Sequence, residues 1–249
     1  TRVIKINPAS LTGELRIKNH KGTGSDIVPG ELLRLMNQKW STNDKAAKGM
    51  DAHKFVANYY MNGKCPPWVY AMLLIPEVIP LLKGASPDDG MRPISMASVL
   101  PRTWKAATAR QLAVDAEFHH CPLQLGVSTP SGGSTMALTV QLFMELWGHV
   151  PETAVIAMDM YNAYGEMIME AMCSALENSE NPRYRSLVPW FIALVSPMVK
   201  TKNVEITVQD GGQQGCPLMP LIFAECYNQA LKRLQALHLL PITKIFDSS

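Results

Sequence analysis

The sequence has few charged residues and no long apolar run. Charged side chains make up 18% of the 249 residues and hydrophobic ones 47%, whereas an average globular protein is roughly 25% charged. This composition can form a packed core, so we exclude disorder as the main state. No stretch approaches the roughly 18 uninterrupted apolar residues of a membrane-spanning helix, so we expect no membrane association. The chain starts at Thr1, without Met or a secretory signal sequence, and we expect it to be part of a longer protein.

Cysteine is scarce and irregularly placed. The five cysteines form no C-x-x-C pair, which argues against a disulfide framework and against a zinc ribbon. His119, His120 and Cys121 are adjacent, but three consecutive residues cannot all face one ion on a regular element. We therefore expect an intracellular protein in a reducing compartment.

Charge is unevenly distributed along the chain. Residues 1–110 contain 16 Lys and Arg against 8 Asp and Glu, whereas residues 111–249 contain 7 against 13. A basic first half suggests contact with phosphates, and an acidic second half suggests carboxylates with a role other than phosphate binding. Ordinary surface variation explains the same asymmetry when charge is considered alone.

Hydrophobic periodicity and turn residues predict a mixture of helices and strands without a regular alternation, which favours an α+β fold. Residues 78–82 and 91–95 are expected to pair as a hairpin, and residues 41–51 to be polar and exposed. The other expected strands are 153–158 and 204–208. The expected helices are 31–36, 52–61, 99–119, 134–147 with Ser134 as its cap, 164–177, 186–199 and 221–237.

Asp159 directly follows the apolar run 153–158, which we expect to be a buried strand. A carboxylate in that place is either a helix N-cap or a group that binds a cation. The six residues from Asp159 to Tyr164 read D-M-Y-N-A-Y. They resemble the first polymerase motif of reverse transcriptases, in the D-x-x-N-A-[FY] form common in non-LTR (LINE-type) retrotransposons.

Residues 211–223 read G-G-Q-Q-G-C-P-L-M-P-L-I-F. They are similar to the second palm motif of the same family, G-x-x-Q-G-x-P-L-x-P-x-x-F. A turn before a helix would explain the glycines and prolines, but neither the Gln-Gly pair nor the position of Phe223.

Four further segments resemble the family, in the family's order. Arg92-Pro93-Ile94-Ser95 is similar to its R-P-I-S finger signature, and residues 78–83 to its lysine-bearing strand. Residues 21–26 weakly echo its K-x-P-G-x-D-G loop but lack the proline and the last glycine. Residues 124–127, followed by Gly132 and Gly133, are similar to its Q-x-G-[FV] segment. The resemblance therefore extends from residue 21 to residue 223.

The resemblance implies the fingers and palm of a right-hand polymerase, with the palm incomplete and the thumb absent. The implied units are 1–95 (N-terminal extension and fingers), 96–165 (first part of the palm), 166–207 (return to the fingers) and 208–249 (second part of the palm). The implied activity is RNA-directed DNA synthesis. The implied partners are an RNA template, a DNA primer and deoxynucleoside triphosphates, with a nuclear location if the source is a eukaryotic retrotransposon.

The resemblance also implies the metal site. Asp159 would bridge two Mg²⁺ ions, helped by the backbone carbonyl of Met160. Mg²⁺ prefers hard oxygen ligands, and two such ions can activate the attacking oxygen and stabilise the leaving one.

The substrate residues follow from the same resemblance. Lys83 and Arg92 would hold the triphosphate, and Gln214 and Gly215 would lie beside the incoming nucleotide and template. The ring of Tyr164 would exclude a 2′ hydroxyl. A core tyrosine and a solvated turn lysine remain the alternatives for Tyr164 and Lys83.

A second carboxylate pair, usually in an [FY]-x-D-D turn, is missing from the sequence. After Gln214 the only acidic residues are Glu225 and Asp247. Either the sequence stops before that motif or Asp247 is a degenerate remnant of it. The missing start Met and the missing thumb segment favour the first, so we expect this stretch alone to be inactive. Two alternatives stay open: a catalytically dead relative that only binds nucleic acid, and a purely helical scaffold.

Overall fold

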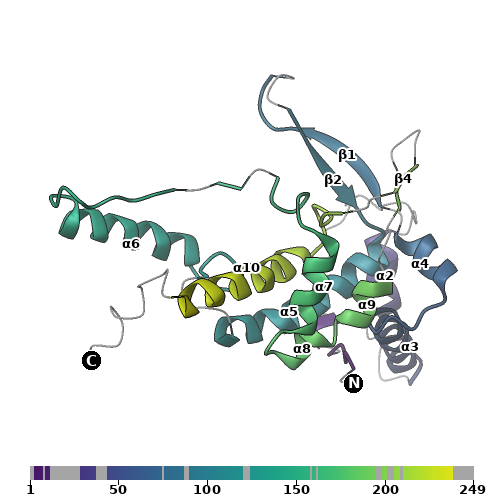
Figure 1. Ribbon diagram of the computed structural model, residues 1–249. Helices are drawn as coiled ribbons and strands as arrows, with labels where there is room; N and C mark the ends of the chain where they lie inside the picture. Colours follow the sequence, from purple (N-terminus) through teal and green to yellow (C-terminus); the bar gives the residue numbers. More distant parts are fainter. Residues whose placement is uncertain are drawn as a thin grey trace.

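A computed structural model describes most of the chain, as a body of helices with a small sheet at its edge (Figure 1). The residues that it describes are 3–7, 9–11, 29–37, 44–74, 76–86, 90–119, 124–157, 159–160, 162–193, 198–200, 205–207 and 210–237. The expectations for residues 21–26, His120, Cys121 and Asp247 lie outside them. Within the described residues, no helix combines the length and the apolarity needed to cross a membrane.

Helices account for most of the described residues. They are α2 (Gly30–Asn37), α3 (Asp44–Met61), α4 (Pro67–Leu74), α5 (Val99–His119), α6 (Gly132–Trp147), α7 (Met169–Glu177), α8 (Pro182–Arg185), α9 (Val188–Ala193) and α10 (Met219–Ala236). The strands are β1 (Glu77–Leu82), β2 (Met91–Met96), β3 (Met198–Lys200) and β4 (Glu205–Thr207). The described residues thus combine helices with a small sheet, and the strands exclude a purely helical scaffold.

The sheet has the strand order β2-β1-β3-β4. Strands β1 and β2 form the predicted antiparallel hairpin, with Leu81 opposite Arg92 and Ile79 opposite Ile94. Strand β3 pairs in parallel with β1 and antiparallel with β4. In Figure 1 the β1–β2 hairpin rises from the helical body.

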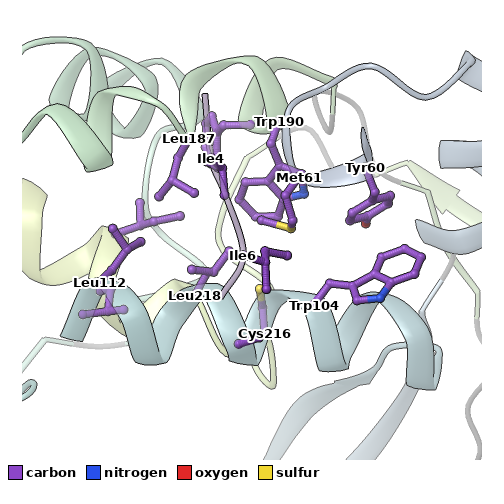
Figure 2. Close-up of a cluster of buried hydrophobic side chains, with 14 of the residues drawn as sticks. Ile4, Ile6, Tyr60, Met61, Trp104, Leu112, Leu187, Trp190, Cys216 and Leu218 are labelled. Carbon is purple, nitrogen blue, oxygen red and sulfur yellow. The ribbon is translucent and has the colours of Figure 1, made fainter. Parts of the chain in front are cut away.

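The core gathers apolar side chains from segments that are distant in the sequence (Figure 2). Tyr60 of α3, Trp104 of α5 and Trp190 of α9 are almost completely buried. The N-terminal segment joins them through Ile4 and Ile6, and Asn62 holds it in place. The Asn62 side chain accepts a hydrogen bond from the Ile4 N–H and donates one to the Ile4 carbonyl, both at 2.8 Å.

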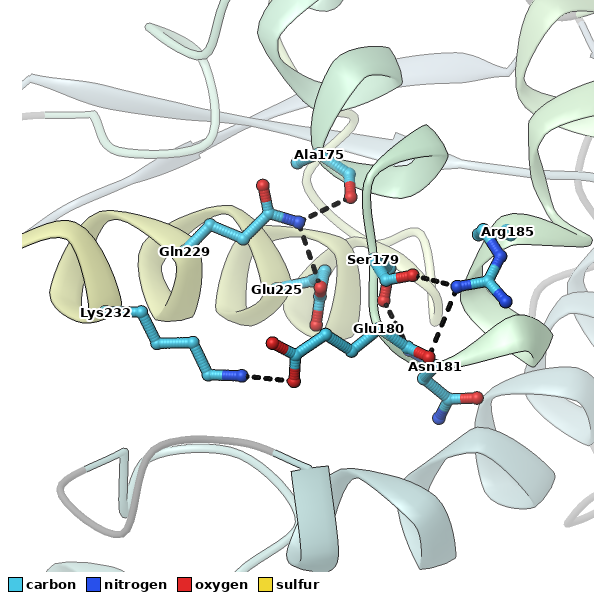
Figure 3. Close-up of polar contacts among 8 residues, drawn as sticks. All are labelled: Ala175, Ser179, Glu180, Asn181, Arg185, Glu225, Gln229 and Lys232. Atoms are coloured by element: carbon cyan, nitrogen blue, oxygen red, sulfur yellow. Dashed lines mark hydrogen bonds and ion pairs between the residues drawn. The ribbon is translucent and has the colours of Figure 1, made fainter. Parts of the chain in front are cut away.

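A polar cluster connects α7 and the following turn to α10 (Figure 3). The Gln229 side-chain amide donates to the Ala175 carbonyl at 2.6 Å and to the Glu225 carboxylate at 3.1 Å. Lys232 forms an ion pair with Glu180 at 2.6 Å. These bonds fix α10, which directly follows the 211–218 loop, against the segment that begins with α7.

Several predicted boundaries are wrong. Helix α3 begins at Asp44, inside the stretch predicted to be merely polar and exposed, and α4 was not predicted. The segment predicted as one helix over 186–199 contains the shorter helix α9 and the start of β3 instead, and α8 ends just before it. Ser134 is not a cap: α6 begins at Gly132 after Ser131, which has φ 56° and makes no side-chain cap bond.

Helix α7 begins at Met169, five residues later than predicted. The reason lies in the carbonyl groups of residues 164 and 167. The Tyr164 carbonyl accepts from the Gly212 N–H at 2.5 Å, and the Met167 carbonyl accepts from the Gly211 N–H at 2.8 Å. Because a helix would need these carbonyls for its own hydrogen bonds, the segment forms turns instead.

The predicted buried strand over residues 153–158 is also wrong. Its described part, 153–157, is not a strand, and Val155 and Ile156 are 48% and 80% exposed. A strand needs a neighbour that takes its backbone hydrogen bonds, and no strand of the described sheet pairs with this segment. The neighbouring helix α6 extends away from the body in Figure 1 and is exposed along most of its length.

Candidate active site

The end of strand β2 meets the loop before α10. The backbone N–H of Ser95 donates to the Gln214 carbonyl at 2.7 Å. This bond joins the segments that resemble the R-P-I-S signature and the second palm motif. Two motifs that are far apart in the sequence are thus in direct contact.

Gly215 is required by this contact. Its φ is +104°, a conformation that side-chain-bearing residues rarely adopt, and a Cβ would lie 2.6 Å from the Ser95 carbonyl oxygen. A close backbone approach at Gly215 was predicted toward nucleotide and template. In the structure, the backbone that lies close to Gly215 is that of β2.

The segment that follows Asp159 closes against the same loop. Besides the backbone bonds of Gly211 and Gly212 to residues 167 and 164, the Gln214 side-chain amide lies 3.5 Å from the Asn162 Oδ1. Asn162 has φ 46°, in the left-handed region that Asn tolerates better than most residues. All three segments that carry the strongest resemblance therefore meet at the 211–215 loop.

Tyr164 lies at the base of this junction. Its ring is partly buried and meets Phe223 of α10 edge-on, with the ring centroids 5.3 Å apart and an interplanar angle of 79°. Edge-to-face pairs of this kind stabilise aromatic packing. The contact orients the Tyr164 ring and leaves part of it exposed. Its role in sugar selection stays a prediction.

Lys83 and Arg92 lie on the hairpin, on one face of it. Leu81 is directly opposite Arg92, and residues that pair in this way present their side chains to the same face. Lys83 follows Leu81 by two residues, so it belongs to that face as well. Both cations are exposed.

The face that carries these cations is the one that meets Gly215. Ile94 follows Arg92 by two residues and therefore shares its face. A Cβ on Gly215 would lie 3.8 Å from the Ile94 Cγ2. An anion bound along this face would thus have two cations above it and the 211–215 loop at its base.

The side chains of Asp159 and Met160 are both exposed to solvent, that of Met160 by 52%. The nearby acids have other roles: the Asp210 carboxylate accepts from the Met169 N–H at 3.1 Å, and the Glu166 carboxylate lies 3.4 Å from the Asn162 amide. Within the ranges that the structure describes, no three side chains of His, Cys, Asp or Glu gather closely enough to hold a metal ion. The described residues alone therefore do not fit a two-magnesium site.

Two residues of this junction had no role assigned from the sequence. From the sequence, Asn162 was only one position of its motif. In the structure its backbone lies in the left-handed region, and its side chain contacts Gln214. Asp210 caps the start of α7 from the other side of the junction. An acidic residue just before a Gly-Gly turn was the available signal, but its partner Met169 could not be identified from spacing.

No family model matches the chain. One curated protein, the "Retrovirus-related Pol polyprotein from type-1 retrotransposable element R2" of Popillia japonica, is 26% identical to it over 191 residues. That relative is a retrotransposon protein. The aligned region covers 73% of this chain and 26% of the relative, so the chain corresponds to about a quarter of that protein's length. The match supports a relationship to retrotransposon Pol polyproteins.

Proposed function

We propose that the chain is the fingers and palm region of a non-LTR reverse transcriptase. In this proposal, the units are those given by the resemblance, namely 1–95, 96–165, 166–207 and 208–249. The observation that carries it is the meeting of three motif segments at the 211–215 loop. The similarity to a retrotransposon Pol polyprotein supports it independently of the geometry.

The proposed substrate is a deoxynucleoside triphosphate bound between the hairpin and the 211–215 loop. Lys83 and Arg92 share the hairpin face that meets this loop, and two cations on one face suit a triphosphate. The Gln214 carbonyl holds the end of the hairpin at Ser95, and its side-chain amide lies 3.5 Å from the Asn162 Oδ1. In this proposal that amide hydrogen-bonds a base or a sugar. An RNA template and a DNA primer are the proposed macromolecular partners.

Asp159 and the Met160 carbonyl are the proposed Mg²⁺ ligands of this chain. A metal at this place would stabilise the charge that develops on the transferred phosphate. Because the described residues supply too few carboxylates for two ions, further acidic ligands have to complete the site.

The test is primer extension by the protein that contains this chain. Asp159→Asn removes the proposed ligand charge and should abolish extension, because loss of such a charge costs several kcal/mol of transition-state stabilisation. Glu152→Gln, another exposed acid on the same segment, is the matched control and should extend normally. Normal extension by Asp159→Asn would overturn the polymerase assignment of Asp159. Duplex binding with no extension by the wild type would favour a binding-only relative.

A further inference from the structure

A pocket outside the candidate active site lies between the N-terminal segment (residues 3–7), α5 and α8. Its volume is about 210 Å³. A cavity of about 150 Å³ holds a benzene ring, so this pocket has room for one large side chain. In Figure 1 the N-terminal end of the chain lies beside α8, away from the hairpin. The lining residues are Val3, Ile4, Lys5, Thr108, Gln111, Leu112, Arg183 and Ser186.

The N-terminal segment is an extended chain with one buried face and one exposed face. Ile4 and Ile6 are 8% and 1% exposed and belong to the core shown in Figure 2. Val3, Lys5 and Asn7 alternate with them and are exposed. Alternation with a period of two is typical of a strand. The segment therefore runs as a strand would, although it takes no part in the described sheet.

One backbone edge of this extended segment is bound to α3 and its end. The N–H and the carbonyl of Ile4 both bond the Asn62 side chain at 2.8 Å. The Ile6 N–H donates to a side chain of α3 at 2.7 Å. In an extended chain the backbone groups of neighbouring residues point to opposite sides. The backbone groups of Val3 and Lys5 therefore point away from α3.

The other backbone edge borders the pocket. The Lys5 carbonyl accepts a long hydrogen bond, 3.4 Å, from the side-chain amide of Gln111, and both residues line the pocket. Within the residues that the structure describes, no hydrogen bond is made by the Lys5 N–H or by the Val3 carbonyl. An edge of this kind is a template to which an extended peptide can add as a further strand.

Two cations border the same pocket. Lys5 and Arg183 are both exposed, and the described lining contains no Asp or Glu. The backbone of Arg183 is held in place, since its N–H donates to the Asn181 Oδ1 at 2.9 Å and its carbonyl accepts from the Ser186 hydroxyl at 2.6 Å. The positive lining favours an anionic partner, and a carboxylate forms strong hydrogen bonds with such cations.

The pocket is apolar where it meets the core. Leu112 and Ile4 line it and are 3% and 8% exposed. An aliphatic side chain placed against them would be removed from water, which favours its binding. Because the pocket has room for about one residue, the aliphatic group and the carboxylate have to belong to the same residue. A C-terminal leucine or isoleucine carries both on one Cα.

We propose that this pocket binds the C-terminus of a partner protein that ends in an aliphatic residue. The last side chain of the partner lies on the apolar floor, and its terminal carboxylate is bound by Lys5 and Arg183. The backbone that precedes it pairs with the pocket-side edge of residues 3–5. The site is separate from the proposed triphosphate site and does not depend on it.

The experiment measures fluorescence anisotropy of an N-terminally labelled hexapeptide, G-S-T-S-T-L, with the 249-residue chain. The peptide with a terminal carboxylate should bind at least about tenfold more tightly than the same peptide with a terminal amide, because the amide has no charge for the two cations. A peptide that ends in serine instead of leucine should bind at least about tenfold more weakly, because its last side chain buries little apolar surface.

Two double variants test the cations. Lys5→Gln/Arg183→Gln should remove the difference between the carboxylate and amide peptides and keep the preference for leucine over serine. The bonds that hold Arg183 use its backbone, so this change keeps them. Lys54→Gln/Arg233→Gln removes the same charge from α3 and α10, outside the pocket. It should leave binding of the carboxylate peptide within about twofold of the wild type.

N-acetyl-leucine tests the contribution of the peptide backbone, since it keeps the side chain and the carboxylate but has no preceding residues. It should displace the labelled peptide at least about tenfold less effectively than the unlabelled hexapeptide does. Equal displacement would overturn the assignment to a protein C-terminus and indicate a small carboxylate as the ligand.

Equal binding of the carboxylate and amide peptides by the wild type, or no binding of either, would overturn the proposal. A difference that survives in Lys5→Gln/Arg183→Gln, with its circular dichroism spectrum preserved, would overturn it too, because other groups would then bind the carboxylate. An equal loss with the control pair would show a general charge effect and would also overturn it. If Lys5→Gln/Arg183→Gln does not fold, the comparison of the two peptides on the wild type decides alone.

Discussion

The backbone N–H of Ser95 donates to the carbonyl oxygen of Gln214 at 2.7 Å. This one bond connects the end of the hairpin that carries Lys83 and Arg92 to the loop that carries the Gln-Gly pair. It sets the position of two exposed cations relative to the start of α10. The four predictions that follow concern this junction and the packing that supports it.

Replacing Gly215 by Ala should loosen the junction. The new Cβ would lie 2.6 Å from the Ser95 carbonyl at a backbone φ of +104°, and strained residues of this kind cost about 1–3 kcal/mol. Chemical denaturation should show a loss of that size. Gly133→Ala is the control, because a Cβ there meets nothing within 4 Å and Ala favours a helix by about 0.5–1 kcal/mol. Equal stability of Gly215→Ala and wild type would show that the loop can shift at no cost.

Replacing Tyr164 by Val should admit ribonucleotides, because the ring that would exclude a 2′ hydroxyl is removed. The measurement is the ratio of kcat/KM for dGTP and GTP in primer extension by the protein that contains this chain. Tyr227→Val is the control, since Tyr227 stacks on the same Phe223 at 6.3 Å and is 43% exposed. An unchanged ratio for Tyr164→Val would make Tyr164 a packing residue only.

Acid should destabilise the core through His53. Its Nε2 accepts from the Trp104 Nε1–H at 2.8 Å, and burial lowers the pKa of the imidazole below its ordinary value of 6.5. The unfolded chain therefore binds this proton more readily, so stability is lost as the pH falls below about 6.5. One such proton contributes at most about 1.4 kcal/mol per pH unit.

His53→Gln tests this dependence, because the Gln oxygen can still accept from Trp104 but does not titrate near neutral pH. Urea unfolding between pH 7.5 and 5 should show a shallower loss for the variant than for the wild type. Parallel profiles of the two proteins would assign the acid sensitivity to other groups.

Removing the Gln229 side chain should weaken the attachment of α10. Its amide bonds the Ala175 carbonyl at 2.6 Å within the cluster of Figure 3, so Gln229→Ala should cost about 0.5–1.5 kcal/mol of unfolding free energy. Gln141→Ala, which removes an exposed bond to Glu145 within α6, should cost less than about 0.5 kcal/mol. Similar losses for both variants would contradict a special role for the α7–α10 contact.

The hairpin and most helices could be predicted from the sequence because their signals are local. Residues 78–82 and 91–95 flank a turn, and residues 99–119 form the predicted helix along their whole length. The start of α7 could not be predicted locally, since the carbonyls of Tyr164 and Met167 bond to a loop more than forty residues later. A distant loop that takes these carbonyl hydrogen bonds does not alter the hydrophobic periodicity of residues 164–177.

The motif segments of the site could be predicted from the sequence, but the contacts between them could not. The resemblance picked out residues 92–95, 159–164 and 211–223, and the structure brings described parts of all three together. Residues 153–158 show the limit of pattern reasoning, because an apolar run becomes a strand only when another strand pairs with it. The burial that was expected for Val155 and Ile156 rested on such a partner.

Photolabelling with an azido derivative of dATP tests the central claim most directly, namely that the hairpin face and the 211–215 loop form a nucleotide site. The chain is irradiated with the probe in the presence of Mg²⁺, digested, and its labelled peptides are identified. We expect label in the peptides that contain 92–95 or 211–216, competition by unlabelled dATP, and loss of label in Lys83→Gln/Arg92→Gln. Label confined to other peptides, with the same competition by dATP, would contradict the account.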